Sequence, residues 1–558
     1  MTDKKKAAQL KEEGNALYVK QEYHAAAEKY SKALEYDSDN AVLYANRAAC
    51  ALGIKDYPHA SVDAQKATEI DPTYAKAWAR LATARAALGT IIESIECWNK
   101  ALSTLPRTNL SPAQSRQKEQ YEAELRKIRA QEHDAPAVGI VMKEGGKEAP
   151  WVRAKAMLPK LRSLGYAMVQ SSAWVISAAY DVAQFEVTTY LFLTLPFFQD
   201  FAQGVELMKS IKKSPTPAGI MYSGPPGAIE ALTNGIMRDS RAFHIADNNW
   251  LEMYNIQVMV NCQRFQAWTG DSSQVIAEAL RRQRKKGWDD VRPAISTTVR
   301  AWIMRALIAD KIQQKSDDAL KFYDWILDVL QWGRRVWKSV PKDDRGSVFE
   351  STFVRGVRSL RLESLMEACS KNPRPDSKYT LEDLFEEAQD LIREIDIAMT
   401  NIPTVEYDPG FISSFYIYPR AHAYAMIGFY HNKMAKQCAE LGVTSLGDVM
   451  IHFAEASKAY LTAATIFPED DENHVWYLNC ALDALYSCGT PIKILLPIME
   501  RVRLAIPKMK EIWEFSALAH QGRDSILQKV LWGEEDMRKG LADGKFTLED
   551  KVMPELQK

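Results

Sequence analysis

Apolar positions recur at a fixed interval over residues 7–106. Small residues return every 34 positions, and bulky residues such as Leu10, Tyr44 and Trp78 keep the same step. Small residues allow two helices to approach closely, and bulky residues fill the space between hairpins, so a period of this length indicates one helical hairpin per unit. The pattern predicts three stacked hairpins, on four sets of positions in register: Gly14, Ala48 and Ala82; Ala26, Ala60 and Ser94; Ala33, Ala67 and Ala101; Ser38, Pro72 and Pro106.

A charged helix and a segment rich in glycine and proline follow these hairpins. Residues 107–132 contain a Ser-Pro pair suited to a helix start, and Tyr121, Leu125 and Ile128 share one helical face. This helix would cap the stack, because the last hairpin otherwise exposes an apolar flank. Residues 133–150 show little periodicity and carry paired glycines, so they predict a linker and the main domain boundary.

The remaining chain is dominated by helical spacing. Residues 151–444 contain almost no alternating, β-branched runs, and they predict an α-helical domain of unassigned fold. Residues 445–558 again suggest a repeat, because the spacing of Ala26, Tyr30, Ala33 and Ser38 returns there. We therefore expect an all-α protein, with an N-terminal repeat superhelix at 1–106 and a large α-solenoid-like domain after it. The returning positions are Ala456, Tyr460, Ala463 and Pro468.

Five polar residues fall at inner positions of the first helix of each repeat. They are Lys11, Asn15, Asn46, Lys76 and Arg80. Lys11 and Asn15 are four residues apart, as are Lys76 and Arg80, so the two residues of each pair lie one turn apart on the same helix face. Positive charge and amide donors that converge in a groove are suited to carboxylates. Any one of these residues is more simply explained as a solvated surface residue, but five matching positions favour an anion site.

The 34-residue pattern resembles the tetratricopeptide repeat (TPR), and the polar positions resemble the carboxylate clamp of TPR co-chaperones. Lys11-Glu-Glu-Gly-Asn15, Asn46-Arg47 and Lys76-Ala-Trp-Ala-Arg80 follow that family's pattern in repeats one, two and three. The resemblance implies a ligand: the C-terminal Glu-Glu-Val-Asp tail of 70- or 90-kilodalton heat-shock chaperones. It also implies roles, with the two terminal carboxylates held by the lysines and asparagines and a tail carbonyl or carboxylate held by the arginine.

By this resemblance the chain is expected to be a co-chaperone or adaptor whose C-terminal helical domain contacts a client or second partner. Of the 558 residues, 47% are hydrophobic and 26% charged, which is typical of a soluble globular protein, and the scattered cysteines fit reduced thiols in a cytoplasmic protein. The 71 basic and 72 acidic residues balance, which gives no general attraction to nucleic acid or anionic membranes. Seven cysteines lack Cys-x-x-Cys spacing, which disfavours zinc and a disulfide framework. The polar N-terminus predicts no signal peptide.

One strongly apolar stretch, residues 173–198, raises the question of membrane contact. Asp181, Gln184 and Glu186 interrupt it, whereas a spanning helix requires about 20 mostly apolar residues. A buried core helix is the favoured interpretation. An organelle-import receptor would keep the clamp and add membrane attachment, and these charged interruptions count against it.

No catalytic, cofactor or metal motif is found in the sequence, so no catalytic residue, cofactor or metal is predicted. The acidic run Glu469–His474 is better explained as the start of a helix, where carboxylates complement the dipole. Ser223–Gly227 lacks the Lys-Ser/Thr of a phosphate loop and predicts a tight turn between helices. An enzyme with an unrecognised active site in residues 151–558, localised by its TPR domain, stays an alternative.

Arg281–Lys286 is the one concentrated basic run. It is either a nuclear import signal, a phosphate-binding strip or, as favoured here, the end of a helix before Gly287, where cations complement the dipole. The preferred chaperone, the ligand of residues 151–558 and the oligomeric state are not determined by these patterns.

Overall fold

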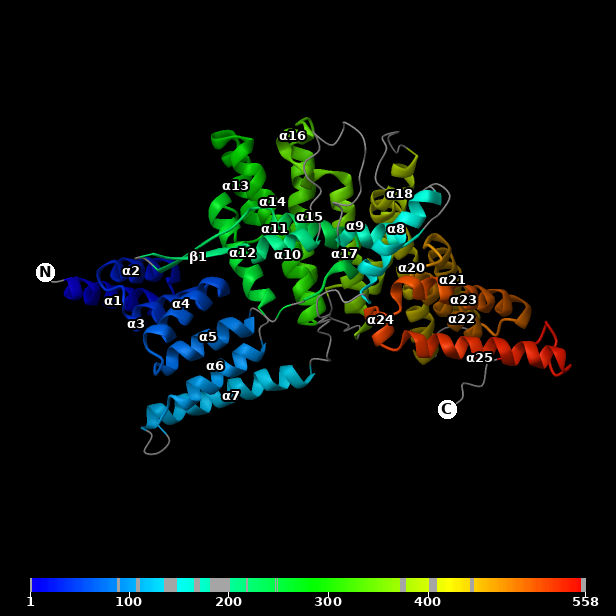
Figure 1. Ribbon diagram of the computed structural model, residues 1–558, viewed down its shortest axis with the longest axis horizontal. Helices are drawn as coiled ribbons and strands as arrows, with labels where there is room; N and C mark the ends of the chain where they lie inside the picture. The colour runs from blue at the N-terminus through cyan, green and yellow to red at the C-terminus, as the bar shows by residue number, and fades with distance from the viewer. Residues whose placement is uncertain are drawn as a thin grey trace. The chain divides into compact units, whose positions relative to one another are not determined.

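The structure is a computed structural model, and it describes most of the chain. Within the described residues the protein is all-α, as predicted, apart from one two-stranded antiparallel hairpin (Figure 1). The chain divides into two compact units, and the boundaries predicted at residues 106, 132, 150 and 444 remain predictions. Unit 1 comprises Met1–Gly139, Glu206–Pro226 and Asp247–Gln266; unit 2 comprises Ile140–Val205, Gly227–Ala246 and Ala267–Lys558. The described residues are 3–87, 91–106, 111–134, 148–164, 171–180, 201–216, 219–245, 247, 249–371, 378–400, 409–441 and 446–552.

Unit 1 begins with three successive helical hairpins. Their small residues are buried where the sequence pattern places them, and Ala26, Ala48 and Ala60 are fully buried. Gly14 shows why the position must be small, since a Cβ atom there would lie 2.7 Å from the ring of Tyr30. The hairpins pair α1 (Asp3–Val19) with α2 (Tyr23–Tyr36), α3 (Ala41–Gly53) with α4 (Tyr57–Ile70), and α5 (Ala75–Ala87) with α6 (Ile91–Ser103).

A seventh helix, α7 (Pro112–Asp134), packs on α6. Tyr121, Leu125 and Ile128 are buried against the last hairpin, and the ring centroids of Tyr121 and Trp98 lie 5.4 Å apart. This helix therefore covers the apolar flank of the stack. Most of the predicted linker, residues 135–147, lies outside the described residues.

Unit 1 also contains a β-hairpin of β1 (Lys212–Thr216) and β2 (Gly219–Ser223), paired from Lys212↔Ser223 to Thr216↔Gly219. The segment 223–227 begins with the last residue of β2 and joins this strand to α11 (Ala228–Arg238), so the predicted turn between two helices is wrong. Two side chains of α12 (Trp250–Phe265) hold it. Gln257 and Asn261 donate from their amides to the carbonyl oxygens of Pro225 and Pro226, each at 2.9 Å. These distant donors leave no local trace in the sequence.

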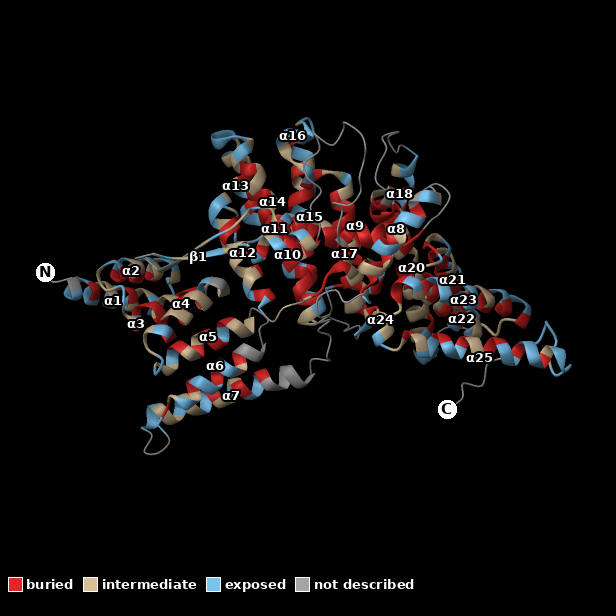
Figure 2. Ribbon diagram, viewed as in Figure 1, coloured by how far each residue is buried: buried red, intermediate tan, exposed pale blue. Residues whose placement is uncertain are grey.

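Unit 2 is built around helices whose buried sides face one another (Figure 2). In helix α14, residues 301–304 have little or no exposure. Beyond α11, its helices are α8 (Pro150–Leu164), α9 (Ala173–Tyr180), α10 (Phe201–Lys209, shared with unit 1), η3 (Ser240–Ala242), α13 (Ser272–Lys286), α14 (Trp288–Leu307), η4 (Ile308–Ile312), α15 (Ser316–Val336), α16 (Lys342–Arg345), η5 (Ser347–Phe349), α17 (Ser351–Ser370), α18 (Leu381–Met399), α19 (Pro409–Ile412), η6 (Ser413–Ile417), α20 (Tyr418–Leu441), α21 (Leu446–Ile466), α22 (Glu472–Ser487), α23 (Ile492–Trp513), α24 (Ala517–His520) and α25 (Arg523–Ala542).

The hairpin of α20 and α21 repeats the packing of the first repeat. A Cβ atom on Gly428 would lie 2.7 Å from the ring of Tyr460, the same separation found between Gly14 and Tyr30. Ala456 and Ala463 flank Tyr460 and are fully buried. The returning spacing in residues 445–468 thus marks a real helix-on-helix contact, although the helices are longer than those of unit 1.

The apolar stretch 173–198 is described only in part. Its first residues form α9, where Trp174, Val175 and Ile176 are buried, while residues 181–198 lie outside the described ranges. Among the described helices, none has the length and apolar content needed to cross a bilayer.

Candidate functional site

The predicted site residues come from the first helix of each hairpin in unit 1. Asn40 fixes the start of α3, because its side chain accepts hydrogen bonds from the backbone nitrogens of Val42 and Leu43 at 3.1 and 3.3 Å. The packed Gly14 sets the distance between α1 and α2. These local features fix the start of α3 and the packing of α1 on α2.

Three of the five residues are joined by direct hydrogen bonds. Nδ2 of Asn46 donates to Oδ1 of Asn15 at 3.3 Å, and Nη1 of Arg80 donates to Oδ1 of Asn46 at 3.3 Å. All three side chains are half-buried. The structure therefore brings α1, α3 and α5 together at one polar row, which we call the inner ladder.

The two lysines lie one turn from the ends of this ladder. Lys11 precedes Asn15 on α1, and its side chain is 34% exposed. Lys76 precedes Arg80 on α5 and is exposed, with no ion pair among the residues that the structure describes. Both ammonium groups thus lie at the surface of the helices that form the inner ladder.

One acidic neighbour touches the site. The carboxylate of Glu12 lies 3.3 Å from Nζ of Lys11 and accepts a hydrogen bond from Nδ2 of Asn15 at 3.2 Å. The hydrogen bond from Asn15, followed by the contacts with Lys11, lowers the pKa of this carboxyl group below its ordinary value. Its side chain is 68% exposed, so water screens the pair and the attraction is weak.

Sequence reasoning missed the residue that orients Asn15. The hydroxyl of Tyr30 donates to Oδ1 of Asn15 at 2.8 Å, and the ring is 1% exposed. Burial raises the pKa of Tyr30 to about 12, so the hydroxyl keeps its proton and its role as a donor. Because Oδ1 receives this bond, Nδ2 of Asn15 is turned outward, where it meets Glu12.

Arg47, next to Asn46, is engaged elsewhere. Its Nε and Nη2 atoms bind the two carboxylate oxygens of Asp63 at 2.7 Å each, and Nη1 donates to Oγ of Ser31 at 3.0 Å. Burial lowers the pKa of Arg47, but the bond to Asp63 more than offsets this. A signal existed for such contacts: Arg47 and Asp63 are 16 residues apart, the same separation as Gly14 and Tyr30.

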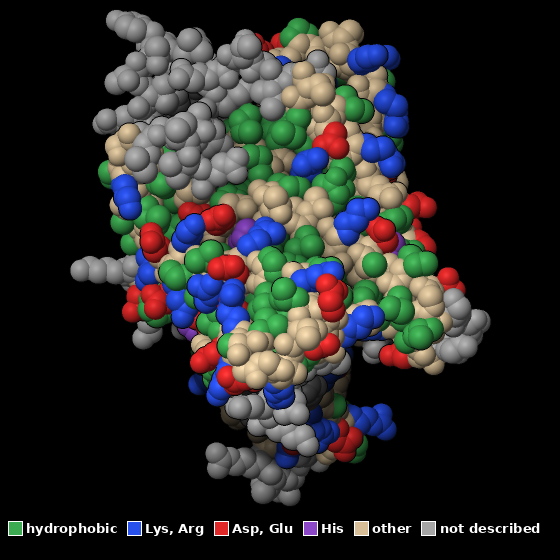
Figure 3. Space-filling model, turned by 90° about the vertical axis from the view of Figure 1, so that its right-hand side faces the viewer, with side chains coloured by type: hydrophobic (Ala, Val, Ile, Leu, Met, Phe, Trp, Pro, Cys, Tyr) green, Lys and Arg blue, Asp and Glu red, His purple; other side chains and the backbone are tan. Residues whose placement is uncertain are grey.

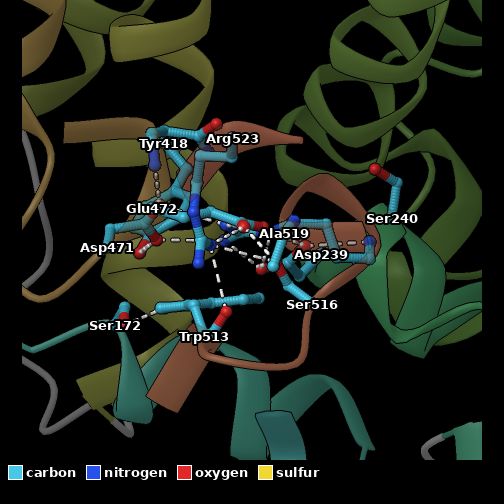
Figure 4. A network of polar contacts seen from close by, with 12 residues as sticks. Ser172, Asp239, Ser240, Tyr418, Asp471, Glu472, Trp513, Ser516, Ala519 and Arg523 are labelled. Atoms are coloured by element: carbon cyan, nitrogen blue, oxygen red, sulfur yellow. Dashed lines mark hydrogen bonds and ion pairs between the residues drawn. The ribbon is translucent and has the colours of Figure 1, made fainter. Parts of the chain in front are cut away.

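Unit 2 contains a separate cluster of buried charges (Figure 4). Nη1 of Arg523 donates to Glu472 at 2.9 Å and to the Trp513 carbonyl oxygen at 3.0 Å, with no exposure of the arginine side chain. Glu472 also accepts a hydrogen bond from Ser516. These contacts tie the start of α22 to the end of α23 and the start of α25.

A second arginine completes this cluster. Arg241 binds Asp239 at 2.7 Å and Asp471 at 3.0 Å, and its guanidinium carbon lies 3.8 Å from the Trp513 ring centroid. Burial raises the pKa of Asp471, but Arg241 more than offsets this, and the pKa is lowered overall. Tyr418 donates to the same carboxylate at 2.6 Å. With every carboxylate paired, the cluster holds helices together rather than presenting a free acid or base.

The acidic run 469–474 acts as predicted. Asp471 caps α22 by accepting a hydrogen bond from the backbone nitrogen of Asn473 at 2.8 Å. Within the part of the chain that is described, no three His, Cys, Asp or Glu side chains are grouped so as to hold a metal ion.

Comparison with known proteins bears on the N-terminal hairpins. A small glutamine-rich tetratricopeptide repeat-containing protein 2 from Saccharomyces cerevisiae is 32% identical over 161 residues, 29% of this chain and 45% of that protein. A Schizosaccharomyces pombe heat shock protein sti1 homolog is 38% identical over 96 residues, 17% of this chain and 16% of that protein. The N-terminal hairpins are a TPR domain, similar to the TPR domains of co-chaperones. No protein-family model matches the chain.

Two further matches cover 17% and 23% of this chain. A heat-shock protein cognate co-chaperone, sgt12 of Aspergillus fumigatus, is 37% identical over 93 residues, 17% of this chain and 27% of that protein. Among solved structures, the first TPR of Spaghetti (RPAP3) bound to the HSP90 peptide SRMEEVD is 30% identical, covering 23% of this chain and 93% of that one, with a TM-score of 0.20. The chain spans less than half the length of these curated relatives.

Proposed function

We propose that the TPR domain binds the C-terminal tail of a 70- or 90-kilodalton heat-shock chaperone, ending in Glu-Glu-Val-Asp, as a cytoplasmic co-chaperone or adaptor. The ligand-binding residues are Lys11, Asn15, Asn46, Lys76 and Arg80. The helices of unit 2 engage a client or a second protein partner. The main support for the proposal is the inner ladder, because its hydrogen bonds join one predicted ligand-binding residue from each of the three repeats: Asn15, Asn46 and Arg80.

The donors left over by the ladder suit a pair of carboxylates. Arg80 has five N–H donors and uses one on Asn46, while Asn46 has two and uses one on Asn15. Lys76 adds three donors and a full positive charge, and Lys11 adds the donors that its ion pair with Glu12 leaves over. The main-chain carboxylate and the aspartate side chain of the tail would bind the lysines and asparagines, with Arg80 on a tail carbonyl or carboxylate.

The relatives support the same assignment. Their names describe heat-shock and cognate co-chaperone proteins. Tail binding through charge-assisted hydrogen bonds at a half-exposed site corresponds to micromolar affinity, about 8 kcal/mol.

Calorimetry with a Glu-Glu-Val-Asp peptide tests the proposal. Lys76→Glu should abolish binding, whereas Lys32→Glu, the same change at an exposed lysine on α2, should leave it unchanged. Amidating the peptide should remove most of the affinity, because one of the two carboxylates is lost. Equal affinity for the acid and amide peptides would refute the clamp.

A further inference from the structure

The end of unit 2 formed by α13 and α15 carries an excess of positive charge. Five cations are exposed there and have no carboxylate partner among the described residues. We call them the basic end: Arg281, Arg284, Lys285, Arg335 and Lys338.

The two helices end side by side. Both pack against α14, and α13 also packs against α15. Trp288, just after α13, and Trp337, just after α15, have ring centroids 4.9 Å apart. Oγ of Ser272, at the start of α13, donates to Asp328 of α15 at 3.1 Å. Because Asp328 precedes Trp337 along α15 as Ser272 precedes Trp288, the two contacts together show that the helices run in the same direction. The C-terminal ends of both therefore face the same region.

On α13 the unpaired cations share one face. Arg281 is three residues before Arg284 and four before Lys285, so the three lie on neighbouring turns of the same side. The buried residues Val275 and Ala279 occupy the opposite side of the helix. The three side chains thus project away from the core of unit 2.

Two other cations of α13, Arg282 and Lys286, form ion pairs within unit 2 and are not part of the basic end. Arg282 lies 4.8 Å from the Trp268 ring centroid and 2.5 Å from Asp290, and Lys286 lies 3.5 Å from the same carboxylate. The other nearby carboxylates include Asp289, which pairs with Arg292 at 3.2 Å. Asp289 and Asp290 are thus committed to neighbouring arginines and lysines, whereas the exposed Asp343 and Asp344 of α16 have no ion pair among the described residues.

Helix-end electrostatics account for only part of this charge. A helix C-terminus behaves as roughly half a negative charge, so two ends together offset about one cation. Gly287, with a φ of 80°, already ends α13 without help from a side chain. Five unpaired cations exceed what the dipoles compensate, and the excess is available to a ligand.

We propose that the basic end binds an acidic segment of a protein partner, independently of the TPR site. The complementary charge sets the chemistry of the ligand, and arginine binds carboxylates in a bidentate fashion. The aromatic rings at this end pack on one another, and Trp337 is 3% exposed, so no platform is presented for stacked bases. The net charge of the whole chain is −1, so the rest of the surface adds no general attraction for a long polyanion.

Fluorescence anisotropy with the full chain tests this proposal. The probe is a labelled, C-terminally amidated peptide of five Glu-Gly repeats, and the reference is the same peptide with Gln in place of Glu. We expect binding of the Glu peptide that weakens as salt rises, and no binding of the Gln peptide. Because the probe has no terminal carboxylate, Lys76→Glu should not change its affinity.

Two double variants with the same change in charge separate a local site from general repulsion. Arg281→Glu/Lys285→Glu should weaken binding by at least about five-fold, whereas Lys160→Glu/Lys529→Glu, at exposed lysines of α8 and α25, should have no comparable effect. Arg281→Gln/Lys285→Gln, with an unchanged unfolding temperature, should give an intermediate loss and shows that folding is retained.

Several outcomes would overturn the proposal. Absence of binding to the Glu peptide, or equal losses in the two charge-reversed variants, would show that there is no acidic-peptide site at this end. Binding of a 20-nucleotide single-stranded DNA or of phosphatidylserine vesicles, lost in Arg281→Glu/Lys285→Glu while the peptide does not bind, would assign the surface to another class of partner.

Discussion

Asn46 occupies the middle of the inner ladder, so its replacement by alanine tests the site most directly. The side chain donates to Asn15 and accepts from Arg80, both at 3.3 Å. Asn46→Ala removes both contacts together with the donor proposed to meet the ligand carboxylate. Helix α3 should persist, because alanine is the best helix former and Asn40 still caps the first turn.

The size of the effect follows from these contacts. A hydrogen bond to a charged group contributes about 1.5–3 kcal/mol, and each 1.4 kcal/mol is about a ten-fold change in affinity. Losing the ligand bond should therefore weaken tail binding by about 10- to 100-fold. The two ladder bonds are long and half-exposed, so the free energy of unfolding should fall by no more than about 1 kcal/mol.

Calorimetry and chemical denaturation on the same preparations separate these two effects. The matched control is Asn99→Ala, which removes an exposed asparagine side chain from α6 in the same domain. Its peptide affinity should equal that of the unmodified protein. If Asn46→Ala bound the free-acid peptide as tightly as Asn99→Ala, the ladder would have no part in ligand binding.

Three further predictions follow from single contacts. Glu12→Gln should increase the affinity for the tail peptide in calorimetry. The substitution removes the carboxylate that competes with the ligand for Lys11, and the net charge of the site becomes more positive. Arg241→Ala should lower the free energy of unfolding of unit 2 by about 3–5 kcal/mol in urea, since Asp471 would stay buried without its partner. Burial raises the pKa of Asp470 to about 6 from 3.8, so its stabilising contribution is present below pH 4 and lost as the pH rises through 6. Asp470→Asn should then raise the free energy of unfolding at pH 8 by about 1–2 kcal/mol and have little effect near pH 4.

Each of these predictions has its own control. Glu22→Gln changes an exposed carboxylate at the N-cap of α2 and should not alter tail affinity. Arg393→Ala removes an exposed arginine of α18 and should cost less than about 1 kcal/mol, so an equal loss in Arg241→Ala would contradict the buried-pair argument. A pH-independent effect of Asp470→Asn would show that the carboxyl group titrates normally in the folded protein.

Charged side chains elsewhere on the surface are mixed in sign, unlike those of the basic end. The face in Figure 3 shows basic, acidic and hydrophobic side chains intermingled. Such mixed surfaces give short-range pairs whose effects are small and screened by salt. The basic end differs because its cations lack partners among the described residues.

The repeat itself was predictable, because a helix has a fixed number of residues per turn and a repeated hairpin brings the same positions together each time. The register of Gly14, Ala48 and Ala82 was enough to place Asn15, Asn46 and Arg80 on one inner face. The return of the spacing at Ala456 and Tyr460 likewise marked a second close contact, now seen with Gly428.

Contacts between residues far apart in the chain were decided only by the folded protein. The pairing of Arg241 with Asp471 spans 230 residues, and the hydrogen bond from Gln257 to Pro225 spans 32. The sequence pattern predicts that the ring of Tyr30 fills the space between helices. The hydrogen bond from its hydroxyl to Asn15 depends on how α1 and α2 cross, which only the folded protein shows. Periodicity records which face of a helix is buried, whereas the partner on that face depends on how separate helices pack.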